Sequence, residues 1–172
     1  MKNLLLRIND KIYMTCIWVA GLSVLAISLM IPWGVFARYV LGTGSSWPEP
    51  TAILLMMVFT FIGAACAYRA GGHIAVTMLT ERLPDGLQRV LAVAVDGLMG
   101  LVCGFCLVWG TRLCLETWNQ GIAELPWLPV GATYAALPVG AALTLLFVLE
   151  KRLFGPQNHR AVVRFDEVRP EA

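Results

Sequence analysis

Asp96 lies inside a long apolar segment of this sequence, which makes it the first candidate for chemistry. A charged side chain at the centre of a membrane helix costs about 2.5–3.5 kcal/mol on insertion scales, so such a residue usually has a function or a partner. One interpretation is a relay for an ion or a proton. Because no second ionisable group lies at a similar depth, we favour a structural interpretation, in which a protonated or paired Asp96 holds two helices together or reaches toward Arg69 or His73.

Cys103 and Cys106 have the CxxC spacing of thiol redox sites and form the second candidate. A redox interpretation makes the chain a membrane thiol-disulfide oxidoreductase, which needs a thiolate stabilised by nearby positive charge and a relay partner. These two cysteines lie in an apolar segment without a neighbouring base, and the five cysteines of the chain make no disulfide framework. We therefore interpret them as small hydrophobic residues and keep the oxidoreductase as an alternative.

Arg38, Trp47 and Glu49 lie on a short, glycine-containing connection between two apolar segments. The Arg38 and Glu49 side chains stand at the ends of adjacent helices, where they can pair and so fix the hairpin. They can equally present a charged patch to a binding partner, and the sequence alone does not separate these alternatives.

Arg69, Gly71 and His73 form a fourth candidate group, at the end of the second apolar segment. The two glycines that follow Arg69 are a natural stop signal for a helix. Residues 73–84 alternate loosely between apolar and polar side chains and are too few to cross a membrane. We interpret them as a short segment on the cytoplasmic membrane surface, and the Arg and His as a basic flank.

Several classes of function lack support in the sequence. No cluster of His, Cys, Asp and Glu has the spacing of a metal site, and we find neither a phosphate-binding glycine loop nor a Ser/His/Asp set. A net charge of +2 is too small to indicate nucleic-acid binding. We therefore predict no metal, no cofactor and no enzymatic activity.

Four apolar segments position these residues: Ile12–Ala37, Pro50–Tyr68, Val90–Thr111 and Leu125–Leu149. The shortest has 19 residues, which gives about 28 Å of helix and matches the hydrocarbon thickness of a bilayer. The hydrophobic fraction of 58% and the mean hydropathy of +0.71 exceed the values of most soluble domains. The sequence therefore predicts four membrane spans.

Lysine and arginine alternate between rich and poor segments along the chain. The five segments that flank the spans hold 3, 1, 3, 1 and 5 of these residues, so the rich ones contain 11 of the 13. Because cytoplasmic loops carry an excess of Lys and Arg, this pattern places both termini in the cytoplasm.

Short connections predict two antiparallel helical hairpins that pack into a four-helix bundle, so the expected fold is all-α and integral to the membrane. Residues 1–153 form this bundle, and residues 154–172 form a polar cytoplasmic tail. Beside Asp96, the third span carries Gly97, Gly100 and Gly104. The spacing of the last two places both glycines on one face and allows close approach of another helix.

Three stretches of the sequence resemble one family. The first is FARYVLG at 36–42 with WPE at 47–49, and the most specific is FIGAACAYRAGGHIAV at 61–76. The third, looser stretch has LP at 125–126, Tyr134 and LPVG at 137–140. Over roughly residues 10–153 the chain is similar to the small membrane subunit (Q, or DctQ-like) of tripartite ATP-independent periplasmic (TRAP) transporters.

This resemblance implies a role in transport. In such systems a periplasmic solute-binding protein captures an organic acid and delivers it to a large membrane subunit that moves as an elevator. The small subunit is expected to be a scaffold in the bacterial inner membrane, which stabilises the large subunit and helps to dock the binding protein. On that view Arg38, Trp47 and Glu49 face the periplasm, whereas the group around Arg69 anchors the cytoplasmic side to lipids or to the large subunit.

Two other functions stay open beside this one. One is the oxidoreductase that uses Cys103 and Cys106, and the other is an independent homo-oligomeric four-helix channel or exporter. In the second case Asp96 and the glycine face would build a contact between copies. Four helices with few polar groups are a poor transport pathway by themselves. The sequence reveals neither the cargo nor the coupling ion.

Overall fold

The structure, a computed structural model, describes residues 2–43, 46–71, 84–155, 157 and 162–163. Its long helices are α1 (Lys2–Tyr39), α2 (Pro48–Arg69), α4 (Asp85–Glu116) and α6 (Ala136–Phe154), and the short α5 (Val130–Tyr134) precedes α6. In this described part of the chain, four helical segments are long and apolar enough to cross a membrane, the fourth being α5 and α6 together. The prediction of four membrane-spanning helices is confirmed at this level.

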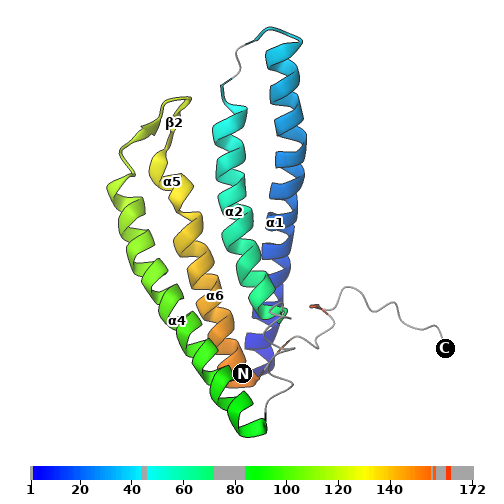
Figure 1. Ribbon diagram of the computed structural model, residues 1–172, viewed down its shortest axis with the longest axis vertical. Helices are drawn as coiled ribbons and strands as arrows, with labels where there is room; N and C mark the ends of the chain where they lie inside the picture. The colour runs from blue at the N-terminus through cyan, green and yellow to red at the C-terminus, as the bar shows by residue number, and fades with distance from the viewer. Residues whose placement is uncertain (1, 44–45, 72–83, 156, 158–161, 164–172) are drawn as a thin grey trace, which may run out of the picture.

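Helix α1 begins ten residues before the predicted start of the first span, Ile12. Its 38 residues correspond to about 57 Å, well beyond the ~30 Å of a hydrocarbon core. The sequence marks where the apolar run begins, but the charged residues before it are compatible with a helix and do not end it. The helix also continues through Pro32 without a break (Figure 1).

The predicted start of the fourth span is wrong. Residues Leu125–Pro129 form strand β2, which pairs antiparallel with β1 (Gly121–Ile122), so the fold is not purely helical. Pro126 and Pro129 have no N–H to donate to a helix, but they are tolerated in a strand with an unpaired edge. The fourth membrane segment therefore begins at Val130.

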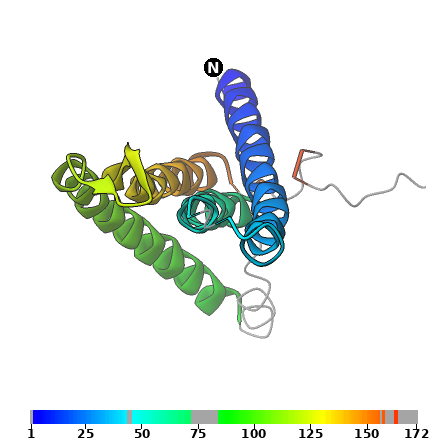
Figure 2. The ribbon, with the colours of Figure 1, turned by 90° about the horizontal axis from the view of Figure 1, so that it is seen from above.

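The helices pack in the order α1, α2, α6, α4, with α2 and α6 in the centre (Figure 2). Gly140 brings the two central helices close together. A Cβ atom added there would lie 2.7 Å from both the Cβ and the carbonyl oxygen of Phe61. Any larger residue at this position would force α6 away from α2.

The two ends of the bundle differ. At the closed end, as we call it, lie the start of α1, the end of α2, the start of α4 and the end of α6, whereas the α1–α2 connection and β1–β2 form the open end (Figure 1). The core cluster is centred on Tyr13, Ala65, Cys66 and Phe147, toward the closed end. From the predicted tail, the described Val162 and Val163 pack against this cluster.

Candidate functional site

Arg69 connects three helices at the closed end. From α2, its Nε donates to Glu150 Oε2 on α6 at 2.8 Å, and its Nη2 donates to Glu150 Oε1 at 2.8 Å. The same Nη2 donates to Asp10 Oδ1 on α1 at 2.7 Å. The fork-shaped contact with Glu150 uses both carboxylate oxygens, which is the geometry that favours arginine over lysine.

Burial makes these ion pairs important. The side chains of Arg69 and Glu150 are each 1% exposed, and that of Asp10 is 13% exposed. The guanidinium also lies 5.1 Å from the ring centre of Tyr13 and 5.3 Å from that of Phe147, within the range of cation–π attraction. Within the described part of the chain, its Nη1 has no hydrogen-bond acceptor. The two rings thus add cation–π attraction to the ion pairs of the guanidinium. We call these five residues the Arg69 cluster.

Asp96 belongs to a second cluster beside the first. Its Oδ1 accepts hydrogen bonds from the Tyr68 hydroxyl at 2.9 Å and from Lys151 Nζ at 2.6 Å. The Lys151 ammonium also lies 5.5 Å from the centre of the Tyr68 ring. Asp96 thus links α4 to α2 and α6, and we call Tyr68, Asp96 and Lys151 the Asp96 cluster. Arg69, named from the sequence as a possible partner, is instead bound to Asp10 and Glu150.

Residues that are consecutive in the sequence belong to different clusters. Tyr68 and Arg69 are consecutive on α2, and Glu150 and Lys151 are consecutive on α6. Each central helix therefore gives one residue to the Arg69 cluster and an adjacent one to the Asp96 cluster. Directly after α2, Gly71 adopts φ +73°, a conformation that suits glycine at a helix end. His73 and the predicted surface segment lie outside the described residues.

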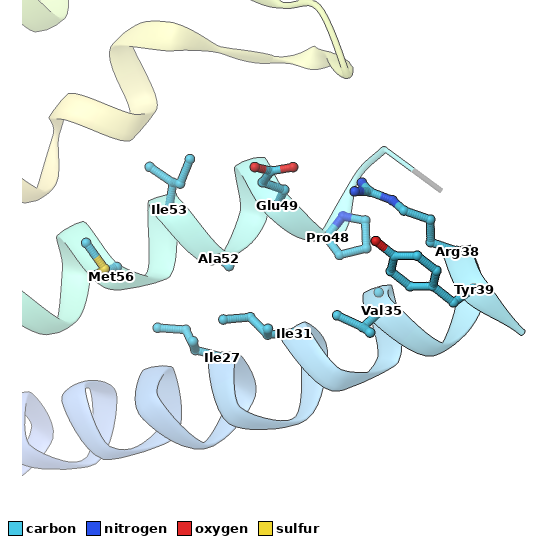
Figure 3. Close-up of a pocket in the computed structure, with 11 residues that line it drawn as sticks. Ile27, Ile31, Val35, Arg38, Tyr39, Pro48, Glu49, Ala52, Ile53 and Met56 are labelled. Atoms are coloured by element: carbon cyan, nitrogen blue, oxygen red, sulfur yellow. The ribbon is translucent and has the colours of Figure 1, made fainter. Parts of the chain in front are cut away.

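At the open end, Arg38, Trp47 and Glu49 are exposed. Both Arg38 and Glu49 are described, and no ion pair joins them. Arg38 and Glu49 line two clefts on opposite sides of α2. One, of about 430 Å³, lies between α1 and α2 (Figure 3), and the other, of about 600 Å³, lies between α2, the β-hairpin and α5. The second cleft also contains Glu124 and Thr133.

Three glycines in the middle of α4 face open space within this chain, whereas Gly110 lies close to Leu137 and Pro138 of α6. A Cβ atom added to Gly97, Gly100 or Gly104 would have no atom within 4 Å. The closest approaches occur at other glycines, at Gly131 beside Cys114 and at Gly140 beside Phe61. At these three positions the other described residues of the chain therefore leave room for a larger side chain.

Cys103 and Cys106 both lie on α4 and are free thiols, with Cys103 buried. Cys16 and Cys66, which the sequence did not single out, belong to the core cluster between α1 and α2. The described residues contain no group of three or more His, Cys, Asp and Glu that could hold a metal ion.

Sequence reasoning missed Asp10, Tyr13, Phe147, Glu150 and Lys151, which complete the two clusters. A signal for some of them was present. Asp10 lies two residues before the first apolar run, and Glu150 with Lys151 directly follows the fourth. Charges at the boundary of each run, on the side of the membrane that the sequence predicts for Arg69 as well, were candidates for pairing with it.

Comparison with known proteins gives a consistent result. Residues 27–155 match the family described as tripartite ATP-independent periplasmic transporters, DctQ component. A protein of Haemophilus influenzae named as a TRAP transporter small permease is 28% identical, over 88% of this chain and 91% of its own length. The sialic acid TRAP transporter small permease SiaQ of Vibrio cholerae is 25% identical, over 73% of this chain and 72% of its length. The ectoine TRAP transporter small permease TeaB of Halomonas elongata is also 25% identical, over 73% of this chain and 66% of its own length.

Proposed function

The chain belongs to the DctQ family of small TRAP transporter subunits, and we propose on that premise that it is the stationary scaffold of an importer for organic acids. The subunits of this family are transport components and not enzymes. The match over residues 27–155 is the single observation that carries the proposal. The large membrane subunit and a periplasmic solute-binding protein are its expected partners.

A scaffold has to keep one shape while its partner moves, and the closed end suits that task. Two clusters of buried or half-buried ion pairs tie α1, α2, α4 and α6 together there. Breaking a buried ion pair by removing one member is strongly unfavourable, so this end resists separation of the helices.

The outer helices offer surface for a partner in the bilayer. In the most apolar stretch of α4, only 6% of the residues are buried within the chain, compared with 33% in the segment of α5 and α6. The exposed residues of α4 include Leu101, Phe105 and Val108. We propose that this face, with Gly97, Gly100 and Gly104, packs against helices of the large subunit and otherwise meets lipid.

The distribution of Lys and Arg supports an orientation. We propose that the helices form two antiparallel hairpins in the bacterial inner membrane, with the closed end and both termini in the cytoplasm. The open end then faces the periplasm, where Arg38, Trp47 and Glu49 are exposed. There they can contribute to the docking of the solute-binding protein.

The cargo belongs to the partner proteins, and the relatives suggest its class. Two of them are named for sialic acid and ectoine, and the first of these names denotes an acid. We therefore propose a small carboxylate as the transported compound.

Purification of the tagged chain in a mild detergent tests the proposal. A scaffold subunit should copurify with a much larger multispanning protein, and its deletion should abolish uptake of the carboxylate by cells. A stable homo-oligomer without that protein would instead support an independent channel or exporter. Loss of uptake on replacing both Cys103 and Cys106 with Ala would favour thiol redox chemistry, whereas the scaffold hypothesis predicts unchanged uptake.

A further inference from the structure

We propose that the cleft between α1 and α2 at the open end binds one phospholipid with a zwitterionic, ethanolamine-type head group. We call this cleft the α1–α2 groove. Its apolar wall includes six residues from the two helices: Ile27, Ile31, Val35, Ala52, Ile53 and Met56. Arg38, Tyr39 and Glu49 lie at one end of it (Figure 3).

The length of the groove matches one leaflet of a bilayer. On α1 its lining residues extend from Ile27 to Tyr39, and the charged Arg38 lies eleven positions after Ile27. At 1.5 Å per residue this distance is about 16 Å, close to half of the ~30 Å hydrocarbon thickness. An acyl chain in the groove would therefore run from the level of the head groups to about the middle of the membrane.

The apolar wall suits an acyl chain better than a protein segment. Figure 3 shows Ile27, Ile31 and Val35 of α1 facing α2, where the small Ala52 leaves room between the helices. The volume of about 430 Å³ falls in the usual range of small-molecule pockets, roughly 300–1,000 Å³. A helix with side chains is about 10–12 Å wide, and an extended peptide would bury backbone groups without partners. A hydrocarbon chain needs neither the width of a helix nor partners for backbone groups.

The charges at the groove end select the head group. Both Arg38 and Glu49 are exposed, and no ion pair joins them. A guanidinium binds a phosphate through parallel hydrogen bonds, while a carboxylate attracts an ammonium group. An ethanolamine phospholipid carries both of these groups side by side. An anionic lipid without the ammonium would leave Glu49 facing a negative charge.

Aromatic residues indicate that this end lies at the depth of the head groups. Trp33, Tyr39 and Trp47 are exposed there. Tryptophan and tyrosine concentrate at the interface between membrane and water. The polar end of the groove and the polar part of a lipid therefore lie at the same level.

Native mass spectrometry of the full chain, with any large subunit that copurifies, tests this inference. The protein would be exchanged into detergent with dimyristoyl phosphatidylethanolamine, phosphatidylcholine or phosphatidylglycerol, and the retained lipid counted. We expect phosphatidylethanolamine to be retained most. Arg38→Gln should lower its retention by about two- to five-fold, the range of an exposed charge contact. The matched control is Arg112→Gln, because Arg112 is an exposed arginine on α4 toward the open end of the bundle.

Two further variants separate the head group from the acyl chain. Glu49→Gln should abolish the preference for phosphatidylethanolamine over phosphatidylglycerol. Ala52→Leu should fill the groove and lower the retention of all three lipids, whereas Ala92→Leu, on an exposed position of α4, should not. The inference would be overturned if the wild type retained the three lipids equally and Arg38→Gln retained them to the same extent as the wild type. A photo-crosslinking residue at Ile53 that captures protein in place of lipid would also overturn it. These outcomes do not depend on the cargo or on docking, so they are distinct from a failure of the scaffold proposal.

Discussion

At the closed end of the bundle the Arg69 side chain is 1% exposed and binds two carboxylates, whereas at the open end Arg38 and Glu49 are exposed and not paired with each other. The same helix, α2, carries a charged residue near each of its ends. The difference follows from burial. A buried charge without a partner costs several kcal/mol, while an exposed charge remains solvated without one. The buried charges at the closed end are therefore committed to structure, and Arg38 and Glu49 at the open end remain available for binding.

The largest effect is expected at Arg69. Arg69→Ala removes the ion pairs that Arg69 makes with Glu150 and Asp10, and removal of one member of a buried pair typically costs about 3–5 kcal/mol. Unfolding of the purified protein in detergent measures the loss. Arg112→Ala is the control, since this exposed arginine lies over the Trp109 ring and joins no salt bridge within the described part of the chain. If both variants unfold alike, the Arg69 cluster does not stabilise the closed end.

The two carboxylates of the Arg69 cluster should differ in how much they contribute to stability. Glu150 makes two hydrogen bonds to Arg69 and is 1% exposed, whereas Asp10 accepts one from it and is 13% exposed. Glu150→Gln should therefore destabilise by about 1.5–3 kcal/mol, the range of hydrogen bonds to charged groups, and Asp10→Asn by less. Chemical denaturation of both variants ranks them. The reverse order would show that the link to α1 is the stronger one.

The stability of the protein should also be sensitive to substitutions where the two central helices approach closely. Gly140→Ala places a Cβ atom 2.7 Å from Phe61 atoms, and overpacking of this kind costs about 1–3 kcal/mol. Gly100→Ala is the matched control, because nothing lies within 4 Å of its Cβ position. That change should leave the isolated chain at least as stable, since alanine is the better helix former. A larger change, Gly100→Leu, should reduce copurification of the large subunit if the α4 face is the interface.

A smaller effect is expected at Asp96. Asp96→Asn keeps an acceptor for the Tyr68 hydroxyl but loses the charge opposite Lys151, whose side chain is 38% exposed. Because solvent screens such a pair, we expect a loss of about 1 kcal/mol or less and unchanged ion dependence of uptake. Abolished ion dependence would instead identify a relay.

The smallest effect on stability is expected at the open end. Glu49→Gln should change the stability of the chain by less than about 0.5 kcal/mol, as is usual for exposed positions. It should nevertheless weaken uptake at limiting concentrations of the solute-binding protein if this patch takes part in docking. Saturating binding protein should restore the rate. Unaltered uptake at every concentration would exclude Glu49 from the docking surface.

Much of the helical architecture was predictable, because hydropathy and helix-stop residues are local signals. The predicted Pro50–Tyr68 differs from α2 by two residues at its start and one at its end. The strand at Leu125–Pro129 was not predictable in this way, since an apolar run with prolines is compatible with either structure. The added turns of α1 were missed because hydropathy marks the membrane and not the end of a helix.

The candidate site was less accessible from the sequence. Asp96 and Arg69 could be identified as unusual by their positions, but their partners depend on which helices become neighbours. Arg69 and Glu150 are 81 residues apart, and Asp96 and Lys151 are 55 apart. Without the order of helices in the bundle, no local pattern distinguishes these pairs from others.

The use of consecutive residues by the two clusters has a consequence for the helical phase of α2. Each residue added to an α-helix rotates all later side chains about the helix axis by about 100°. A single insertion between Gly63 and Tyr68 would turn both Tyr68 and Arg69 away from their partners at once. The chain should thus accept length changes in the connection near Gly42, which adopts φ +63° outside the helices, far better than within α2.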